Sequence, residues 1–302
     1  MKHVFVVNPV AGKRRLQKTI DSLIEKAAAE TGISYEIHTT KAEGEPLSFT
    51  RDYLPGEDVR FYAVGGDGTL NEILNGIEQR EGYSELAVVP CGTGDDFGKM
   101  LAEREKLTDI AAQIKTKARP TDIIVCHNDS SDMSIINMVN IGVDADVAAN
   151  VHRYSRIFPG FSAYIVSLLE RVFLHSMGTK LKVTIDNRLV IKGTFSLVSL
   201  GNGAYCGGGF CAAPKADIDD GLMEITMIKP VTRREFVRLI KGYRDGTYIE
   251  DPAYDGYFRY LRGSKVHLEA EQPLNICVDG NFITSDDITF EIKPGKVNFV
   301  RL

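Results

Sequence analysis

The chain has few cysteines and no long apolar run. None of its five cysteines forms a C-x-x-C pair, which excludes a disulfide framework and a structural zinc site and favours a reducing compartment. No stretch reaches the ~18 uncharged apolar residues of a membrane span, and the N-terminal apolar run is too short for a signal peptide. We therefore expect a cytoplasmic protein that reaches a membrane only from its inner face.

An excess of basic residues is also missing. The chain carries 36 Lys and Arg against 41 Asp and Glu, and its net charge is −5. Proteins that bind a nucleic-acid duplex neutralise phosphates with a basic stripe, so we expect no nucleic-acid partner. With 43% hydrophobic and 25% charged residues the chain is typical of folded proteins, and its 302 residues suffice for two domains.

Residues 1–120 alternate between strand and helix patterns. Short apolar runs predict strands, and apolar residues at helical spacing predict helices. The strands are expected at residues 4–7, 35–37, 60–64 and 86–89, and the helices at 16–29 and 70–77. This alternation predicts a parallel sheet flanked by helices.

Residues 121–302 contain many strand patterns separated by Gly, Asn, Asp and Pro turns, which is typical of an antiparallel sandwich or barrel. Strands are expected at 122–125, 181–185, 194–200, 222–228, 265–268, 274–278 and 288–292, and helices at 164–174 and 233–243. The change of pattern predicts an α/β domain at 1–120 and a β domain at 121–302.

The motif GGDGTLNE at residues 65–72 lies between a predicted strand and a predicted helix. Its glycines let the backbone come close to a ligand, and the free N–H groups at a helix start favour a phosphate. A plain turn with Thr69 as the helix N-cap is the alternative interpretation. That alternative leaves Asp67 unexplained, because a carboxylate between glycines suits a metal or a hydroxyl.

Two more loops follow predicted strands, at residues 8–13 and 90–99. The first is not a Walker A loop, and the second misses the dinucleotide G-x-G-x-x-G because Phe97 stands where the last glycine is needed. In a parallel sheet the carboxyl ends of the strands share one edge, where ligands bind. We therefore expect the three loops to converge on one ligand site.

Two segments of the second domain are candidate sites. Residues 201–210 contain five glycines, and residues 214–222 gather Asp217, Asp219 and Asp220. The acidic segment can supply oxygen ligands to a hard cation, but a solvated hairpin turn explains it equally well. The six histidines form no H-E-x-x-H motif.

These motifs together resemble the diacylglycerol kinase catalytic family, the bacterial lipid-kinase branch that shares a fold with NAD kinases and sphingosine kinases. The resemblance covers nearly the whole chain. It rests on Asn8-Pro9 with Gly12-Lys13, on residues 65–72, on Gly92-Thr93 with Asp96-Phe97, on residues 140–145, on residues 207–209 with Pro214, on Asp220-Gly221 and on residues 278–280. It implies an α/β nucleotide-binding domain with a parallel sheet, followed by a β-sandwich domain that takes the lipid.

The resemblance also implies the site residues. The nucleotide would be bound by Asn8, Pro9, Gly12, Lys13, Thr40, Gly65, Gly66, Asp67, Gly68, Thr69, Glu72, Gly92 and Thr93. Asp67 and Asp96 would hold the catalytic Mg²⁺. A second, structural Mg²⁺ would be bound by the Asp220 carboxylate and the carbonyls of Asp217 and Leu222.

Two positions depart from the family pattern. The family's base is a Glu directly after Asp-Gly near the C-terminus, and Asn281 occupies that position here. An amide takes no proton near neutral pH, so Asp279, Asp96 or Asp95 would have to substitute as the catalytic base. Asp95 itself replaces the usual Asn, and its added carboxylate should either recruit metal or weaken ATP binding.

The sequence therefore predicts an ATP- and Mg²⁺-dependent kinase that phosphorylates a hydroxyl of diacylglycerol or a related lipid. A nucleotide-binding module without catalysis is one alternative, motivated by Asn281, and NAD kinase is another, motivated by the shared GGDGT. Residues 153–161 mix basic and aromatic side chains and can seat at a membrane, although an ordinary helix entrance explains them as well. A homodimer is compatible with the sequence.

Overall fold

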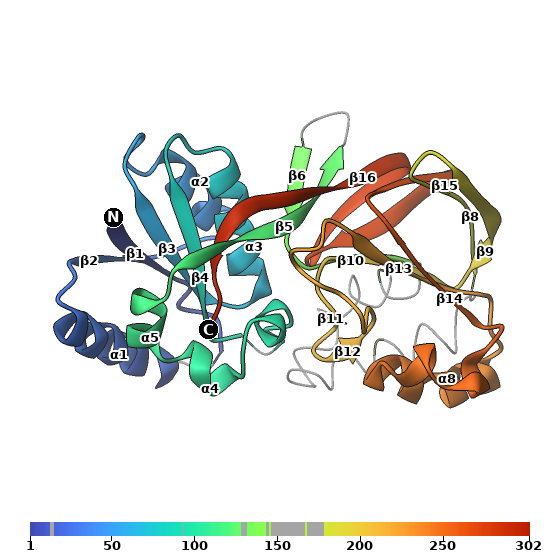
Figure 1. Ribbon diagram of the computed structural model, residues 1–302, viewed down its shortest axis with the longest axis horizontal. Helices are drawn as coiled ribbons and strands as arrows, with labels where there is room; N and C mark the ends of the chain where they lie inside the picture. The colour runs from blue at the N-terminus through green and yellow to red at the C-terminus, as the bar shows by residue number, and fades with distance from the viewer. Residues whose placement is uncertain (13–14, 93, 128–131, 143–144, 146–166, 168–177) are drawn as a thin grey trace. The chain divides into compact units, whose positions relative to one another are not determined.

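The computed structural model describes the chain except residues 13–14, 93, 128–131, 143–144, 146–166 and 168–177 (Figure 1). It divides into two compact units. Unit 1 comprises Met1–Asp122 and Pro294–Leu302, and unit 2 comprises Ile123–Lys293. The C-terminal residues thus return to unit 1, whereas a single boundary near residue 120 assigns them to the second domain.

Unit 1 is built on a parallel sheet with the order β4-β3-β1-β2. These strands are β1 (Lys2–Val7), β2 (Tyr35–Thr39), β3 (Val59–Gly65) and β4 (Ser84–Pro90). All seven residues of β3 and of β4 are buried, as expected for central parallel strands covered on both faces. The predicted parallel sheet is therefore confirmed.

Helices cover this sheet. They are α1 (Arg15–Thr31), α2 (Glu45–Asp52), α3 (Asp67–Glu78), the 3₁₀ helix η1 (Phe97–Met100), α4 (Arg104–Leu107) and α5 (Ile110–Lys115). Ile20 and Ile24 of α1 and Ile110 of α5 share one core cluster with Phe5 and Tyr62 of the sheet. Helix α3 packs closely on α2, because Gly76 leaves room for Thr50.

The strand pairs of unit 2 whose register is described are antiparallel. Its strands are β5 (Ala118–His127, beginning in unit 1), β6 (Asp132–Ile135), β7 (Met138–Gly142), β8 (Thr179–Ile185), β9 (Leu189–Phe195), β10 (Leu197–Gly201), β11 (Tyr205–Cys206), β12 (Phe210–Cys211), β13 (Met223–Ile228), β14 (Phe258–Gly263), β15 (Lys265–Val278) and β16 (Asn281–Val300, ending in unit 1). Its described helices are α8 (Arg233–Asp245), η2 (Thr247–Ile249) and η3 (Pro252–Tyr254).

The long strand β15 takes part in both layers of the sandwich. Its first half pairs with β8, its second half pairs with β7, and its register with β16 shifts between Glu269 and Leu274. One core cluster of 22 described residues lies in the unit, including Val139 and Ile141 of β7, Val198 of β10 and Phe290 of β16, and a second cluster lies around Tyr243. This confirms the predicted β-sandwich.

Several elements differ from the expected ones. Helix α2 was not expected, and the segment 194–200 is divided between β9 and β10. The two strands expected at 265–268 and 274–278 are the single strand β15. The helix expected at 164–174 lies outside the described residues. Among the described residues, no helix is long and apolar enough to cross a membrane.

Candidate functional site

The loop after β3 takes its shape from close packing. A Cβ on Gly65 would lie 2.5 Å from the Thr69 hydroxyl, so only glycine fits there. That hydroxyl accepts a hydrogen bond of 3.0 Å from the amide of Asn8, which lies in the loop after β1. Thr69 is therefore engaged with Asn8 and is not the N-cap. The cap of α3 is Gly66, and no side chain caps this helix.

The loop after β4 meets the same glycine motif. A Cβ on Gly92 would lie 2.7 Å from the Cα of Gly66, and one on Gly66 would lie 3.3 Å from the Cα of Gly92. Two backbones can approach so closely only where both residues are glycine. Together with the Asn8–Thr69 contact, this confirms that the three loops converge at one edge of the sheet. Gly68 is exposed, with open space around its Cα.

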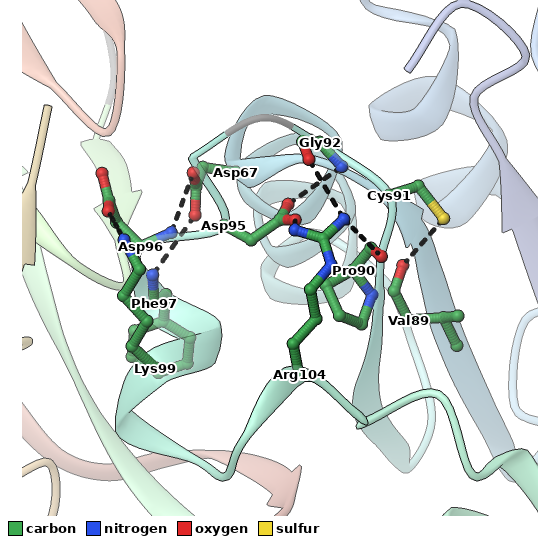
Figure 2. A network of polar contacts seen from close by, with 10 residues as sticks. All are labelled: Asp67, Val89, Pro90, Cys91, Gly92, Asp95, Asp96, Phe97, Lys99 and Arg104. Atoms are coloured by element: carbon green, nitrogen blue, oxygen red, sulfur yellow. Dashed lines mark hydrogen bonds and ion pairs between the residues drawn. The ribbon is translucent and has the colours of Figure 1, made fainter. Parts of the chain in front are cut away.

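Asp67 and Asp96 form a carboxylate pair across two of these loops (Figure 2). The Asp67 carboxylate accepts hydrogen bonds from the backbone N–H groups of Asp96 (3.1 Å) and Phe97 (3.3 Å). Burial, and secondly the nearby Asp96 carboxylate, raise the pKa of Asp67 to about 6. The Lys99 ammonium forms an ion pair with Asp96 and partly offsets this negative charge.

Asp95, unlike its neighbour Asp96, makes its contacts within the loop after β4 and with Arg104. Its buried carboxylate accepts a 3.0 Å hydrogen bond from the Gly92 N–H and forms a 2.7 Å ion pair with Arg104 (Figure 2). Arg104 also donates to the carbonyls of Pro90 and Gly92. The expected extra negative charge at this position is thus compensated, and Asp95 and Arg104 hold the loop after β4 in shape.

Thr40 and Glu72 make structural contacts near the loops. The buried Thr40 donates to the Val7 carbonyl with both its backbone N–H and its hydroxyl. The Glu72 carboxylate accepts a 2.9 Å hydrogen bond from the backbone N–H of Gly44, the N-cap of α2. Glu72 therefore ties the start of α2 to α3.

Two further positions implied for the nucleotide, Pro9 and Gly12, lie in the loop after β1. Gly12 has a φ of 71°, which favours glycine, and Pro9 lies partly buried beside Asn8 in the same loop. Lys13 and Thr93 lie outside the described residues, as do residues 153–161.

In unit 2, Asp279 and Gly280 form the turn between β15 and β16. Their φ values are 47° and 88°, which is the pattern of a two-residue type I′ hairpin turn. The Asp279 carboxylate accepts hydrogen bonds of 2.7 to 3.1 Å from the backbone N–H groups of Ile136, Asn137 and Met138. This engagement favours a structural role for Asp279 over proton transfer, and Asn281 follows as the first residue of β16.

The acidic segment 214–222 meets a cationic side chain. Asp220 accepts the Leu222 N–H at 3.0 Å and forms an ion pair with Arg262. Arg262 also lies 2.7 Å from the buried carboxylate of Glu224, its cross-strand partner. Asp217 accepts the N–H of Asp219 at 3.3 Å. A cation there would compete with the Arg262 guanidinium for the Asp220 carboxylate, and the structural cation expected at Asp217, Asp220 and Leu222 stays a prediction.

The donor set at Asp67 and Asp96 fits Mg²⁺ better. Mg²⁺ keeps several waters and is usually held by one or two carboxylates together with substrate phosphates. Among the residues that the structure describes, no group of three or more His, Cys, Asp or Glu side chains could hold a metal by itself. A cation at this pair would therefore depend on the oxygens of a bound nucleotide.

Sequence patterns do not reveal the basic side chains of these sites. Lys99, Arg104 and Arg262 are each brought to a carboxylate by the fold, and no spacing in the chain marks them as partners. Only Lys99, three residues after Asp96 in η1, is near its partner in sequence.

Comparisons with known proteins also match the chain in two parts, the second of which includes the C-terminal residues that return to unit 1. A family model described as "Diacylglycerol kinase catalytic domain" matches residues 2–126, and one described as "YegS C-terminal NAD kinase beta sandwich-like domain" matches residues 137–301. A Pseudomonas aeruginosa protein named "Probable lipid kinase YegS-like" is 24% identical over 90% of this chain and 86% of its own length. A Bacillus subtilis protein named "Diacylglycerol kinase" is 26% identical over 92% of this chain and 88% of its own.

Solved structures share the fold. The crystal structure of a diacylglycerol kinase from Bacillus anthracis has a TM-score of 0.71 and 22% identity, and covers 100% of this chain and 97% of that protein. An NAD kinase from Archaeoglobus fulgidus in complex with ATP has a TM-score of 0.51 and 13% identity, with 100% and 94% coverage. At these identities the likeness concerns the fold alone.

Proposed function

This chain belongs to the diacylglycerol kinase catalytic family with a YegS-type C-terminal domain, a family of phosphotransferases that act on an alcohol group, and we propose that it is an ATP- and Mg²⁺-dependent lipid kinase. Its acceptor is a hydroxyl of diacylglycerol or a related lipid, which it meets at the inner face of the membrane. The observation that carries the proposal is the convergence of three strand-end loops on the Asp67–Asp96 carboxylate pair.

The loops supply the phosphate site. The first turn of α3 presents backbone N–H groups beside the exposed Gly68, and the positive end of the helix favours the charge of a phosphate. The Asn8–Thr69 and Gly66–Gly92 contacts fix the two flanking loops before a ligand arrives. Phosphoryl transfer depends mostly on positioning and on stabilising charge, so such a preformed cradle is what the reaction requires.

Mg²⁺, when bound, would neutralise charge on the phosphates and would be held by Asp67 and Asp96. Asp67 must be ionised to bind it, and its pKa of about 6 means that it is ionised at neutral pH and increasingly protonated below. Activity should therefore fall as the pH drops through about 6. Its two backbone hydrogen bonds hold the carboxylate in one orientation.

The acceptor hydroxyl lacks the family's usual base. Asn281 cannot take a proton, and the carboxylates of Asp279 and Asp95 are engaged with backbone N–H groups and Arg104. Asp96 in turn forms an ion pair with Lys99, so none of the three substitutes considered stands out as the base. A loose phosphoryl-transfer transition state needs little early deprotonation, so a slow kinase is compatible with this arrangement.

The first test is transfer of label from γ-labelled ATP. Diacylglycerol, monoacylglycerol, phosphatidylglycerol, a sphingoid base and NAD are offered in parallel with Mg²⁺, and Asp67→Ala is the control. Label in one lipid, absent with the control, supports the proposal. Label in NAD alone would overturn it.

Asn281 specifically favours a second candidate, a nucleotide-binding module without catalysis. The variant Asn281→Glu restores the family residue at the start of β16, and a missing base costs about 10²–10⁴-fold in rate. A gain of this size identifies position 281 as the disabled base. ATP binding with no labelled product in either protein would make the non-catalytic module the better description.

A further inference from the structure

Helix α8 lies on the surface of unit 2 (Figure 1). Its exposed side chains form a cationic face. The exposed positions of the helix are Arg233, Arg234, Val237, Arg238, Lys241, Arg244 and Asp245. At 100° per residue, these seven positions fall within one arc of about 140°. Five of the seven are basic, and Asp245 is the one acid among them. We call this arc the cationic face of α8.

The opposite side of α8 is fixed in the core. Leu239, Gly242 and Tyr243 are buried, and Tyr243 lies in the aromatic cluster with Tyr248 and Phe258. A Cβ on Gly242 would lie 2.2 Å from the ring of Tyr254, so the helix sits tightly against that ring. The cationic face is therefore held outward and cannot turn toward the protein.

Local stability does not explain this face. The helix begins with a capping box between Thr232 and Glu235, yet Arg233 and Arg234 follow the cap at the positive end of the helix dipole, where cations are unfavourable. Arg234 and Arg238, Arg238 and Lys241, and Lys241 and Arg244 are like charges three or four residues apart, a spacing at which they repel. Arg238 does gain a hydrogen bond of 3.0 Å to the Tyr257 hydroxyl and lies over that ring. The gathering of like charges on one outward face, against the repulsion within the helix, still points to an anionic partner.

We propose that the cationic face of α8 docks this protein on an anionic phospholipid surface. The proposal rests on the proposed lipid kinase function, because an enzyme with a lipid acceptor must meet the bilayer. Charge complementarity argues for it: the chain as a whole carries −5, so an anionic surface is attracted only where cations gather. Val237, 58% exposed in the middle of the arc, adds an apolar contact to the acyl boundary.

The test is binding to vesicles of phosphatidylcholine containing phosphatidylglycerol, measured by sedimentation. Each surface Lys or Arg contributes about fivefold to such binding, so Arg234→Gln with Lys241→Gln should lower the partition coefficient about 25-fold. Lys26→Gln with Lys117→Gln makes the same charge change at exposed positions of unit 1 and should leave binding within about twofold. Raising the salt concentration should weaken binding of the unaltered protein and of the control alike.

Helix content by circular dichroism shows whether the α8 variant is folded. If it is folded and binds anionic vesicles as the unaltered protein does, the proposal is overturned. Tighter binding of a labelled DNA duplex than of the vesicles, lost in the same variant, would overturn it as well and would indicate a nucleic-acid surface.

Kinase assays with soluble and with vesicle-bound lipid distinguish a failure of membrane docking by α8 from a failure of the proposed kinase function. With a short-chain diacylglycerol in solution the α8 variant should keep the unaltered turnover, and with diacylglycerol in anionic vesicles its apparent KM should rise. If no lipid is phosphorylated under any condition, the kinase function fails, while vesicle binding still reports on α8.

Discussion

Replacing Asp67 with asparagine should stabilise the folded protein and abolish phosphoryl transfer. The structure raises the pKa of this carboxyl from 3.8 to about 6, firstly through burial and secondly through the charge of Asp96. A carboxyl whose pKa is raised in the folded state ionises more easily in the unfolded chain. The free energy of unfolding therefore falls as the pH rises from about 4 to about 6. Above about pH 6 this destabilisation is constant. An asparagine side chain carries no charge and therefore does not cause it.

The magnitude follows from the size of the shift. A change of about two pKa units corresponds to about 3 kcal/mol in the free energy of unfolding. Asparagine has one acceptor oxygen, so it loses one of the hydrogen bonds from Asp96 and Phe97, at a cost of about 0.5–1.5 kcal/mol. The net gain at pH 7.5 is then about 1.5–2.5 kcal/mol, which raises the Tm by about 3–5 °C.

Thermal unfolding at pH 7.5 and pH 4.5, without nucleotide or metal, measures this gain. It should be present at pH 7.5 and vanish at pH 4.5, where the Asp67 carboxyl is itself protonated. Asp109→Asn is a matched control at the start of α5, where the carboxylate accepts the Ala112 N–H at 2.9 Å. Asparagine caps a helix as well as aspartate, so this control should change the Tm little at either pH.

Nucleotide gives the second half of the experiment. Adding ATP with Mg²⁺ should raise the Tm of the unaltered protein and have a much smaller effect on Asp67→Asn, because the variant lacks a ligand for the cation. A Tm that does not rise at pH 7.5, or that rises equally at both pH values, would refute the assigned electrostatic cost. Full kinase activity in the variant would refute the assigned role in catalysis.

Three further substitutions test the contacts around the site. Asp279→Ala leaves three backbone N–H groups without their carboxylate and should lower the free energy of unfolding, measured by urea titration, by about 3–5 kcal/mol. A loss of turnover without this destabilisation would instead indicate that Asp279 is the catalytic base. Arg262→Met leaves the buried Glu224 without its guanidinium and should lower the free energy of unfolding by about 2–4 kcal/mol. A chelator should not change the Tm of the unaltered protein. A drop in Tm with chelator would show that a cation does bind at this turn. Asp95→Asn keeps the hydrogen bond from Gly92 but loses the ion pair with the half-exposed Arg104, so it should cost less than about 1 kcal/mol, and a larger loss would mean that the pair matters more than its exposure allows.

Much of the fold and part of the site could be predicted from short-range patterns. Strands β3 and β4 are continuous apolar runs because both of their faces are covered, and the glycine motif at 65–72 marks a place where backbones touch. The parallel sheet then brings the carboxyl ends of β1, β3 and β4 to one edge. For this reason the convergence of three loops was predictable without any contact being known.

Other features depend on contacts between distant residues. Helix α2 has only eight residues, too few for a clear helical pattern in the sequence. It is held by the packing of Thr50 against Gly76 of α3 and by Glu72 at its start. The expectation that the Asp95 carboxylate recruits metal or weakens ATP binding did not take account of Arg104, which reaches it from another element. The expected cation at Asp220 ignored Arg262, which comes from 42 residues further along the chain.

The path of β16 bears on how the protein is made. This strand starts at Asn281 beside the Asp279–Gly280 turn, and its residues Asn298 and Phe299 pair in parallel with Glu85 and Leu86 of β4. During synthesis from the N-terminus, β4 therefore lacks this partner until residues 298 and 299 have left the ribosome. Unit 1 should complete its sheet only then, and a chain truncated after residue 122 should expose a buried, apolar strand edge and aggregate.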